Sequence, residues 1–169
     1  MTVKIVTDSV SDIPSDLAKQ LDITMVPLTV NFGVESFLDG VEITPKEFFE
    51  KIQTAPSLPT TAAPSIGAFT EVYKDLTGKG HEVVSLHVSG KLSATLSSAT
   101  QAAAELGNEH ISVVDTQAVS AMEALIVTAA ARVAIAGGSV EEVIEKAKSS
   151  IDKTAVYVVL DTLEYLQKG

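Results

Sequence analysis

The chain of 169 residues has no cysteine, no tryptophan and only three histidines. Without cysteine, disulfides, zinc–thiolate sites, iron–sulfur clusters and thiol nucleophiles are all excluded. His81, His87 and His110 are scattered along the sequence, which does not suggest a metal-binding motif. We therefore expect no metal, and any binding chemistry must come from oxygen and nitrogen groups.

Positive charge is also scarce, with 12 Lys+Arg against 22 Asp+Glu and a net charge of −10. An acidic chain without a basic run repels phosphates, so we expect no nucleic acid as partner and at most transient membrane contact. The most apolar stretch, residues 118–138, is interrupted by Glu123 and Arg132, which favours a buried helix over a membrane span. The apolar run at the amino terminus is too short for a signal peptide. We expect a cytoplasmic protein.

Short β-branched runs alternate with helical patterns along the chain, which is typical of βαβ units. The sequence predicts an α/β fold in which helices cover both faces of a doubly wound, mostly parallel sheet. The expected strands are Val3–Thr7, Ile23–Val30, Val83–Val88 and Ile111–Val114. The expected helices cover residues 14–21, 66–76, 119–136 and 140–149, together with an alanine-rich helix that ends at Gly107.

Local signals refine this outline. Gly33 predicts a hairpin into Val34–Leu38, which would place an antiparallel ribbon beside the parallel sheet. Capping boxes, Thr44 with Glu47 and Ser139 with Glu142, predict where two helices begin. The three prolines of residues 55–65 predict a loop.

The last residues suggest a second domain. Residues 155–160 have a strand pattern, and residues 162–168 begin an amphipathic helical pattern. We expect a first domain over residues 1–152, followed over residues 153–169 by the opening strand and helix of an incomplete second α/β domain.

Hydroxyl groups collect where the predicted strands end, in the loops 7–12, 60–65, 89–95 and 115–116. Open α/β sheets bind ligands at this edge, and hydroxyls with free backbone N–H groups suit a carboxylate or a phosphate. Helix capping is the better explanation of any one of these loops taken alone. Four of them together favour a site for an anionic small molecule.

Two kinds of catalytic site can be weighed against this binding site. His87, Ser93 and Asp115 could form a Ser-His-Asp triad, but a Gly-x-Ser-x-Gly motif is absent and His87 lies within a strand pattern. A buried core histidine is the better interpretation. Asp8 with Asp12, or Asp39 with Glu42, could bind Mg²⁺, although helix capping and a solvated surface explain them as well. The phosphate-binding motifs Gly-x-x-x-x-Gly-Lys and Gly-x-Gly-x-x-Gly are both missing.

Six segments, in this order, resemble the DegV family of bacterial fatty-acid-binding proteins, which serve as lipid subunits of fatty acid kinase. The segments are residues 5–12, 26–30, 61–65, 86–95, 113–116 and 160–169. The resemblance covers most of the chain. It implies a DegV-type first domain and a smaller second domain.

The resemblance also implies a function. A long-chain fatty acid would be buried, with its carboxylate held by hydroxyls that match Thr61 and Ser93. Further candidates in the same polar rim are Ser9, Ser11, Ser65 and Ser89. The protein would be a binding subunit rather than an enzyme. It would need no cofactor besides the fatty acid, which it would present to a separate kinase for phosphorylation.

The sequence departs from the family pattern at three places, one of which is Ser89-Gly90 in place of the family's double serine. Thr61-Ala62-Ala63-Pro64-Ser65 replaces the family's Thr-Ser-x-Pro-Ser, and Leu92-Ser93-Ala94-Thr95 replaces its Leu-Ser-Gly-Thr. Rival hypotheses are an enzyme, either akin to dihydroxyacetone kinases or a serine hydrolase, and a fragment that pairs with another chain around Leu163 and Leu166.

Overall fold

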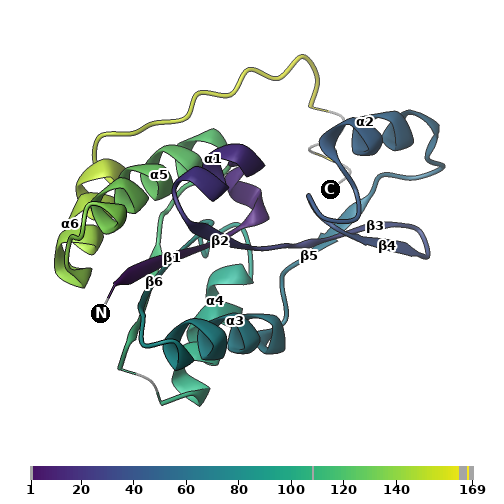
Figure 1. The fold of residues 1–169 in the computed structure, drawn as a ribbon. Coiled ribbons are helices and arrows are strands. Elements are labelled where there is room, and N and C mark those ends of the chain that lie inside the picture. Colours follow the sequence, from purple (N-terminus) through teal and green to yellow (C-terminus); the bar gives the residue numbers. More distant parts are fainter. Residues whose placement is uncertain (1, 108, 164–166, 168–169) are drawn as a thin grey trace.

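A parallel sheet of four strands forms the body of the computed structural model, which describes residues 2–107, 109–163 and 167 (Figure 1). The strands are β1 (Val3–Asp8), β2 (Ile23–Val26), β6 (Glu82–His87) and β7 (Ile111–Asp115). Their order is β2-β1-β6-β7, and each neighbouring pair is parallel. The order runs outward from β1 in both directions, which confirms the predicted doubly wound arrangement.

Helices cover both faces of this sheet. They are α1 (Ser15–Gln20), α3 (Ile66–Gly78), α4 (Thr95–Glu105), α5 (Ala121–Ile135) and α6 (Val140–Ile151). Side chains alternate along β1, so Val3 and Ile5 pack against α1, α5 and α6, whereas Val6 packs against α3 and α4. The two cores lie on opposite sides of the sheet, as Figure 1 shows.

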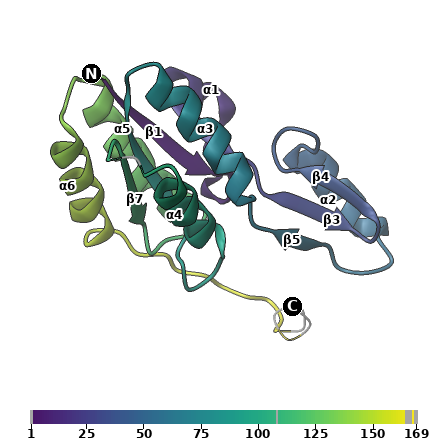
Figure 2. The ribbon, with the colours of Figure 1, turned by 90° about the horizontal axis from the view of Figure 1, so that it is seen from below.

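A small lobe projects from this body (Figure 2). It contains β3 (Thr29–Phe32), β4 (Glu35–Leu38), β5 (Thr60–Ala62) and α2 (Pro45–Thr54). The antiparallel sheet has the order β4-β3-β5, and its own core is built around Val30, Phe32 and Ile43. The hairpin expected at Gly33 is present, with Phe32 opposite Glu35 and a positive φ of 62° at the glycine.

Two expectations about this region were wrong. Residues 23–30 do not form one strand, because Pro27 has no N–H for a ladder and the run divides into β2 and β3. The N–H of Leu28 leaves the ladder as well and donates to Ser9 Oγ over 3.1 Å. Part of the loop expected over residues 55–65 is the strand β5, which pairs with β3.

Residues 155–160 were also predicted as a strand, but they do not form one in this structure. They are extended but have no ladder partner, and Tyr157 and Val159 are 93% and 92% exposed. A strand requires a neighbour for its N–H and C=O groups, and neither sheet reaches this segment. The helix predicted over residues 162–168 lies mostly outside the described residues. No helix in the described part of the chain is long and apolar enough to cross a membrane.

Candidate functional site

The loops at the carboxyl edge of the parallel sheet are tied together by hydrogen bonds. Asp8, at the end of β1, accepts the N–H of Val88 at 3.1 Å through Oδ2 and the N–H of Val10 at 3.1 Å through Oδ1. The N–H of Ser89 donates to the Ala118 carbonyl over 2.9 Å. These contacts join the loops that follow β1, β6 and β7 into one rigid edge.

A buried polar chain runs from α3 to this edge. Tyr73 OH donates to Ser85 Oγ at 2.8 Å, Ser85 Oγ lies 2.6 Å from His87 Nε2, and His87 Nδ1 lies 2.9 Å from Asp8 Oδ2. If each hydroxyl donates to the next acceptor, His87 Nε2 accepts a hydrogen bond from Ser85. His87 Nδ1 then carries the ring proton and donates a hydrogen bond to Asp8 Oδ2. Burial raises the pKa of Tyr73 to about 12, which keeps its hydroxyl a donor.

This chain determines the role of His87. His87 is 0% exposed. The Phe69 ring packs edge-on against the imidazole, with the two ring centroids 5.0 Å apart. Both ring nitrogens are engaged with Ser85 and Asp8, so the alternative triad with Ser93 and Asp115 does not form. The interpretation of His87 as a buried core histidine is confirmed. Ser85, His87 and Asp8 have the order of a catalytic triad, but all three residues are 0% exposed in the described chain.

Of the six predicted ligand residues, three use their hydroxyls inside the loops. Ser9 Oγ accepts the N–H of Leu28, and Ser11 Oγ donates to the Asp8 carbonyl at 2.8 Å. Ser89 Oγ accepts the N–H of Lys91 at 3.3 Å. All three residues are buried, so these side chains hold the loop backbone in place.

Ser65 lies at the start of α3, where its Oγ accepts the N–H of Ala68 at 3.1 Å and caps the helix. Thr61 lies on β5 opposite Val30 and is exposed. In the described part of the chain, the Thr61 hydroxyl has no hydrogen-bond partner. It is therefore available to a ligand at no cost to the fold.

Ser93 lies in the loop between β6 and α4 and is half-buried. Its Oγ lies 2.9 Å from Thr95 Oγ1 and accepts the Thr95 N–H at 3.2 Å. It faces a hollow of about 570 Å³, whose walls include Leu92 and Leu96. This volume lies within the range of about 300–1,000 Å³ that is typical of small-molecule sites. The hydroxyl and the two leucines suit a polar headgroup with an apolar continuation.

Sequence reasoning did not identify Glu123 as a member of this region. Its side chain, in the first turn of α5, is 0% exposed. Oε1 accepts a long hydrogen bond of 3.4 Å from Thr7, while Oε2 has no partner among the described residues. Burial, followed by the charge of Asp8, raises the pKa of Glu123 to about 9. The only signal in the sequence was an acidic residue within an otherwise apolar helix.

Asp8 and Asp12, the first pair considered for Mg²⁺, have other roles. Asp8 is buried within the polar chain described above, and Asp12 Oδ2 accepts a hydrogen bond from Ser120 Oγ at 2.6 Å. Asp12 and Ser120 both adopt positive φ, near 52° and 53°, and their contact joins the loops after β1 and β7. Among the described residues, no cluster of three metal-ligating side chains is present.

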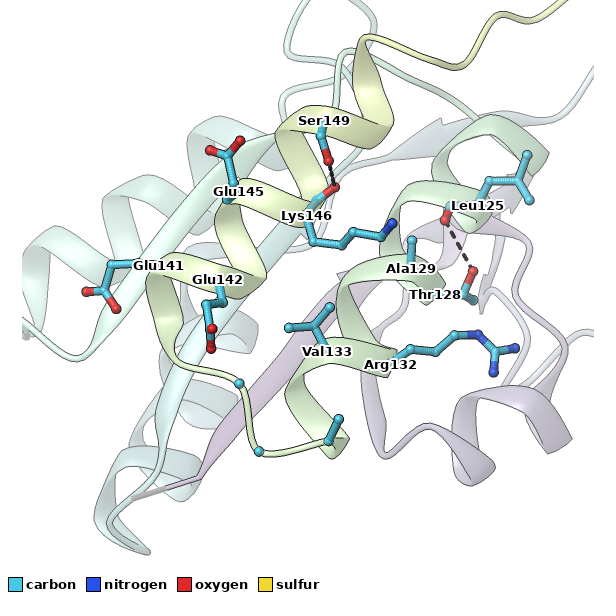
Figure 3. A pocket seen from close by; sticks show the side chains of 13 residues that line it. Leu125, Thr128, Ala129, Arg132, Val133, Glu141, Glu142, Glu145, Lys146 and Ser149 are labelled. Atoms are coloured by element: carbon cyan, nitrogen blue, oxygen red, sulfur yellow. Dashed lines mark hydrogen bonds between the residues drawn. The ribbon is translucent and has the colours of Figure 1, made fainter.

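A larger groove of about 1330 Å³ lies between α5 and α6 (Figure 3). Its hydroxyls are engaged by their own helices. Thr128 donates to the Ala124 carbonyl at 2.7 Å, with the Leu125 carbonyl 3.3 Å away, and Ser149 donates to the Lys146 carbonyl at 3.0 Å. None of the six predicted ligand residues lines it. The groove is therefore separate from the hydroxyl-rich edge.

The fold and the polar edge together define a doubly wound α/β protein with hydroxyl-bearing loops at the carboxyl ends of its parallel strands. The sequence model of a family described as "Uncharacterised protein, DegV family" matches residues 2–169. The chain belongs to the DegV family.

Relatives and solved structures agree with this assignment. The DegV domain-containing protein YejH of Lactococcus lactis is 36% identical over 169 residues, which cover 100% of this chain and 60% of that protein. The solved structure of a DegV family protein from Thermus thermophilus, which is described as binding fatty acid, has a TM-score of 0.91 and 39% sequence identity to this chain. The match covers 100% of this chain and 60% of that one. DegV of Bacillus subtilis, described as a fatty acid binding protein, has a TM-score of 0.82 and 31% sequence identity to this chain. The match covers 90% of this chain and 54% of that one. The chain thus spans about 60% of the length of the relatives it matches.

Proposed function

We propose that the protein is a cytoplasmic fatty-acid-binding subunit that buries a long acyl chain and presents its carboxylate to a separate kinase for phosphorylation. Thr61 and Ser93 would bind the carboxylate. The observation that carries this proposal is the likeness, over the whole chain, to the Thermus protein whose title reports fatty acid binding. The other hydroxyls of the rim, on Ser9, Ser11, Ser65 and Ser89, would support the site by holding its loops.

The local chemistry supports this division of roles. The hydroxyl of Thr61 is free, and that of Ser93 faces the hollow beside α4. A hydrogen bond to a charged group contributes about 1.5–3 kcal/mol, and each methylene removed from water adds about 0.8 kcal/mol. A long acyl tail would therefore supply most of the affinity, and the two hydroxyls would position the headgroup.

The alanine-rich helix α4 does not itself provide space for the tail. Ala99 and Ala102 are 0% exposed and pack against Phe69 and Tyr73. These alanines allow α4 to approach its neighbours closely, which was the alternative explanation of the alanine-rich pattern. The apolar surface at Leu92, which is 67% exposed beside Ser93, is the better start for an acyl chain.

A non-enzymatic role agrees with the arrangement of the polar groups. His87, the histidine at the carboxyl edge, has both nitrogens engaged in the core. His87 therefore does not serve as the base that a hydrolase would need to activate the Ser93 hydroxyl. Phosphoryl transfer would belong to the partner kinase with its ATP–Mg²⁺. We expect acyl phosphate to form only when this protein, the kinase subunit and ATP–Mg²⁺ are all present.

Native mass spectrometry of the purified chain, followed by denaturing lipid extraction, tests the binding role. We expect a co-purified fatty acid of about 14–18 carbons at close to one per chain, since each buried methylene adds affinity. A chain that arrives empty and also fails to take up added palmitate would contradict the proposal.

The substitution Ser93→Ala tests the headgroup assignment. We expect the affinity for palmitate to fall about tenfold, the equivalent of one hydrogen bond to a charged group. Stability should fall by less than about 1 kcal/mol, because only the contacts with Thr95 are lost. Ser150→Ala is the matched control, since that hydroxyl bonds only within α6. Unchanged affinity in Ser93→Ala would remove Ser93 from the site.

A further inference from the structure

The hollow beside Ser93 contains a charged group that the proposed function does not yet use. Among the described residues that line it, Lys91 is the only one with a charged side chain. Ser93 is two residues further along the same loop, and both residues line the same hollow. A cation and a hydroxyl therefore share one wall.

Lys91 has no ion pair within the described part of the chain. Other lysines do, since Lys51 pairs with Glu35 at 2.8 Å and Lys79 with Asp75 at 2.7 Å. Asp115 lies near Gly90 and its Oδ1 accepts the N–H of Gln117 at 2.8 Å, but it does not line the hollow. The ammonium of Lys91 is exposed and can turn toward a ligand without giving up an internal partner.

The backbone that carries Lys91 is held firmly. The Ser89 carbonyl accepts the N–H groups of Leu92 at 2.9 Å and Ser93 at 3.1 Å, and Ser89 Oγ accepts the N–H of Lys91. A Cβ at Gly90 would lie only 2.8 Å from Leu96 Cδ2, so the loop packs closely onto α4. Lys91 and Ser93 therefore keep a fixed spacing, and only the Lys91 side chain has to be ordered when a ligand binds.

Electrostatics favours a cation at this position. The chain has a net charge of −10, so its overall field repels a carboxylate. A hydroxyl alone tolerates an acid, an alcohol or an amide, because it both donates and accepts hydrogen bonds. An ammonium group discriminates, since it attracts the charged acid and gains nothing comparable from a neutral headgroup.

We propose that Lys91 pairs with the ligand carboxylate that Ser93 binds, and that it selects fatty acids over neutral lipids of the same length. This role rests on the proposed function. The ammonium of Lys91 and the hydroxyl of Ser93 would then bind the same carboxylate from one loop. Lys91 would act by binding and selection, with no part in bond making or breaking.

The test is a comparison of two lipids with one tail length. Dissociation constants for palmitate and for hexadecan-1-ol would be measured with the wild-type chain and with Lys91→Gln, Lys91→Arg and Lys19→Gln. We expect Lys91→Gln to weaken palmitate binding about tenfold and to leave hexadecan-1-ol within twofold. Lys91→Arg should retain palmitate binding. Lys19→Gln removes an exposed lysine on α1, outside the hollow, and should change neither constant.

The possible outcomes separate the two proposals. If Ser93→Ala weakens palmitate binding and Lys91→Gln does not, the binding role stands and the role of Lys91 is wrong. An equal loss of both lipids in Lys91→Gln would show a structural effect and would also overturn the selective role. If the wild-type chain binds neither lipid, the binding role falls, and the role of Lys91 falls with it.

Discussion

The two faces of the parallel sheet each bury polar groups, but they satisfy them differently. On the face covered by α3 and α4, Tyr73, Ser85, His87 and Asp8 form one continuous chain of hydrogen bonds. On the face covered by α5 and α6, Glu123 has a single long bond from Thr7 and one oxygen without a described partner. Glu123, His87 and Asp8 are all 0% exposed, so burial alone does not distinguish the two faces.

The difference lies in the partners that each fold element supplies. Asp8 receives two backbone N–H groups and the His87 ring, so its carboxylate is solvated by the protein. Glu123 lies in the first turn of α5, where the helix dipole favours a negative charge by about 0.3–1 kcal/mol. Desolvation of a fully buried carboxylate costs several kcal/mol, so it outweighs the dipole, and the pKa of Glu123 rises to about 9. The buried carboxyl on one face thus has a full set of partners, whereas the one on the other face is held as a neutral acid.

The largest effect is expected from Asp8→Ala. The substitution leaves the His87 ring N–H and the N–H groups of Val10 and Val88 buried without an acceptor. We expect the free energy of unfolding in urea to fall by about 3–5 kcal/mol. Asp8→Asn keeps one acceptor oxygen and should lose less.

Asp75→Ala is the matched control, because it removes an exposed carboxylate paired with Lys79. That change should cost less than about 1 kcal/mol. Equal losses in Asp8→Ala and Asp75→Ala would show that the buried chain adds nothing beyond a surface ion pair, and the contrast between the two faces would disappear.

The next effect concerns Glu123 and depends on pH. The folded chain keeps the Glu123 proton up to about pH 9, whereas an ordinary glutamate releases it near 4.5. Folding therefore takes up a proton between these values, so stability falls as pH rises through this window, by at most about 1.4 kcal/mol per pH unit. Glu123→Gln removes this dependence. We expect the variant to be close to wild type at pH 5 and more stable at pH 8.5, by about 1–3 kcal/mol.

Urea unfolding at pH 5, 7 and 8.5 would measure this difference. Glu105→Gln, at an exposed position on α4, is the control and should leave the slope of stability against pH unchanged. If Glu123→Gln lost stability at pH 8.5, Glu123 would have to be charged and partnered in the folded protein.

The elements that the sequence predicted well are those whose signals are local. The capping boxes at Thr44 and Ser139 are both present and begin α2 and α6. Gly33 turns the hairpin as expected, because its positive φ is a property of that one residue. The doubly wound topology followed from alternating strand and helix patterns, which local propensity and burial both support.

Features that depend on distant partners could not be predicted. The run of residues 23–30 has strand propensity throughout, but only the fold shows that its two halves belong to different sheets. The chain from Tyr73 to Asp8 joins residues on α3, β6 and β1, and its bond between His87 and Asp8 spans 79 positions. Alternation placed Ser85 and His87 on one side of a strand, yet it could not show which residues face them.

The sequence located the hydroxyl-bearing loops of the candidate site, and the ligand roles of their residues stay a prediction. Composition and strand ends located Ser9, Ser11 and Ser89 correctly at the carboxyl edge. A hydroxyl in a loop binds a ligand or the backbone with equal ease, so the sequence could not separate these buried residues from Ser93 and Thr61. Exposure and existing hydrogen bonds make that separation, and both require the fold.

The smallest effect is expected from Tyr73→Phe, which shortens the buried chain at its far end. The ring still fills its place beside Phe69, and Ser85 still donates to His87. Only the bond from Tyr73 OH to Ser85 Oγ is lost, so we expect about 1 kcal/mol less stability in urea unfolding and unchanged binding of palmitate. Tyr157→Phe, at a position that is 93% exposed, is the control and should have no effect. A loss of about 3 kcal/mol in Tyr73→Phe would mean that the chain is cooperative and that the α3 face depends on the whole series of bonds.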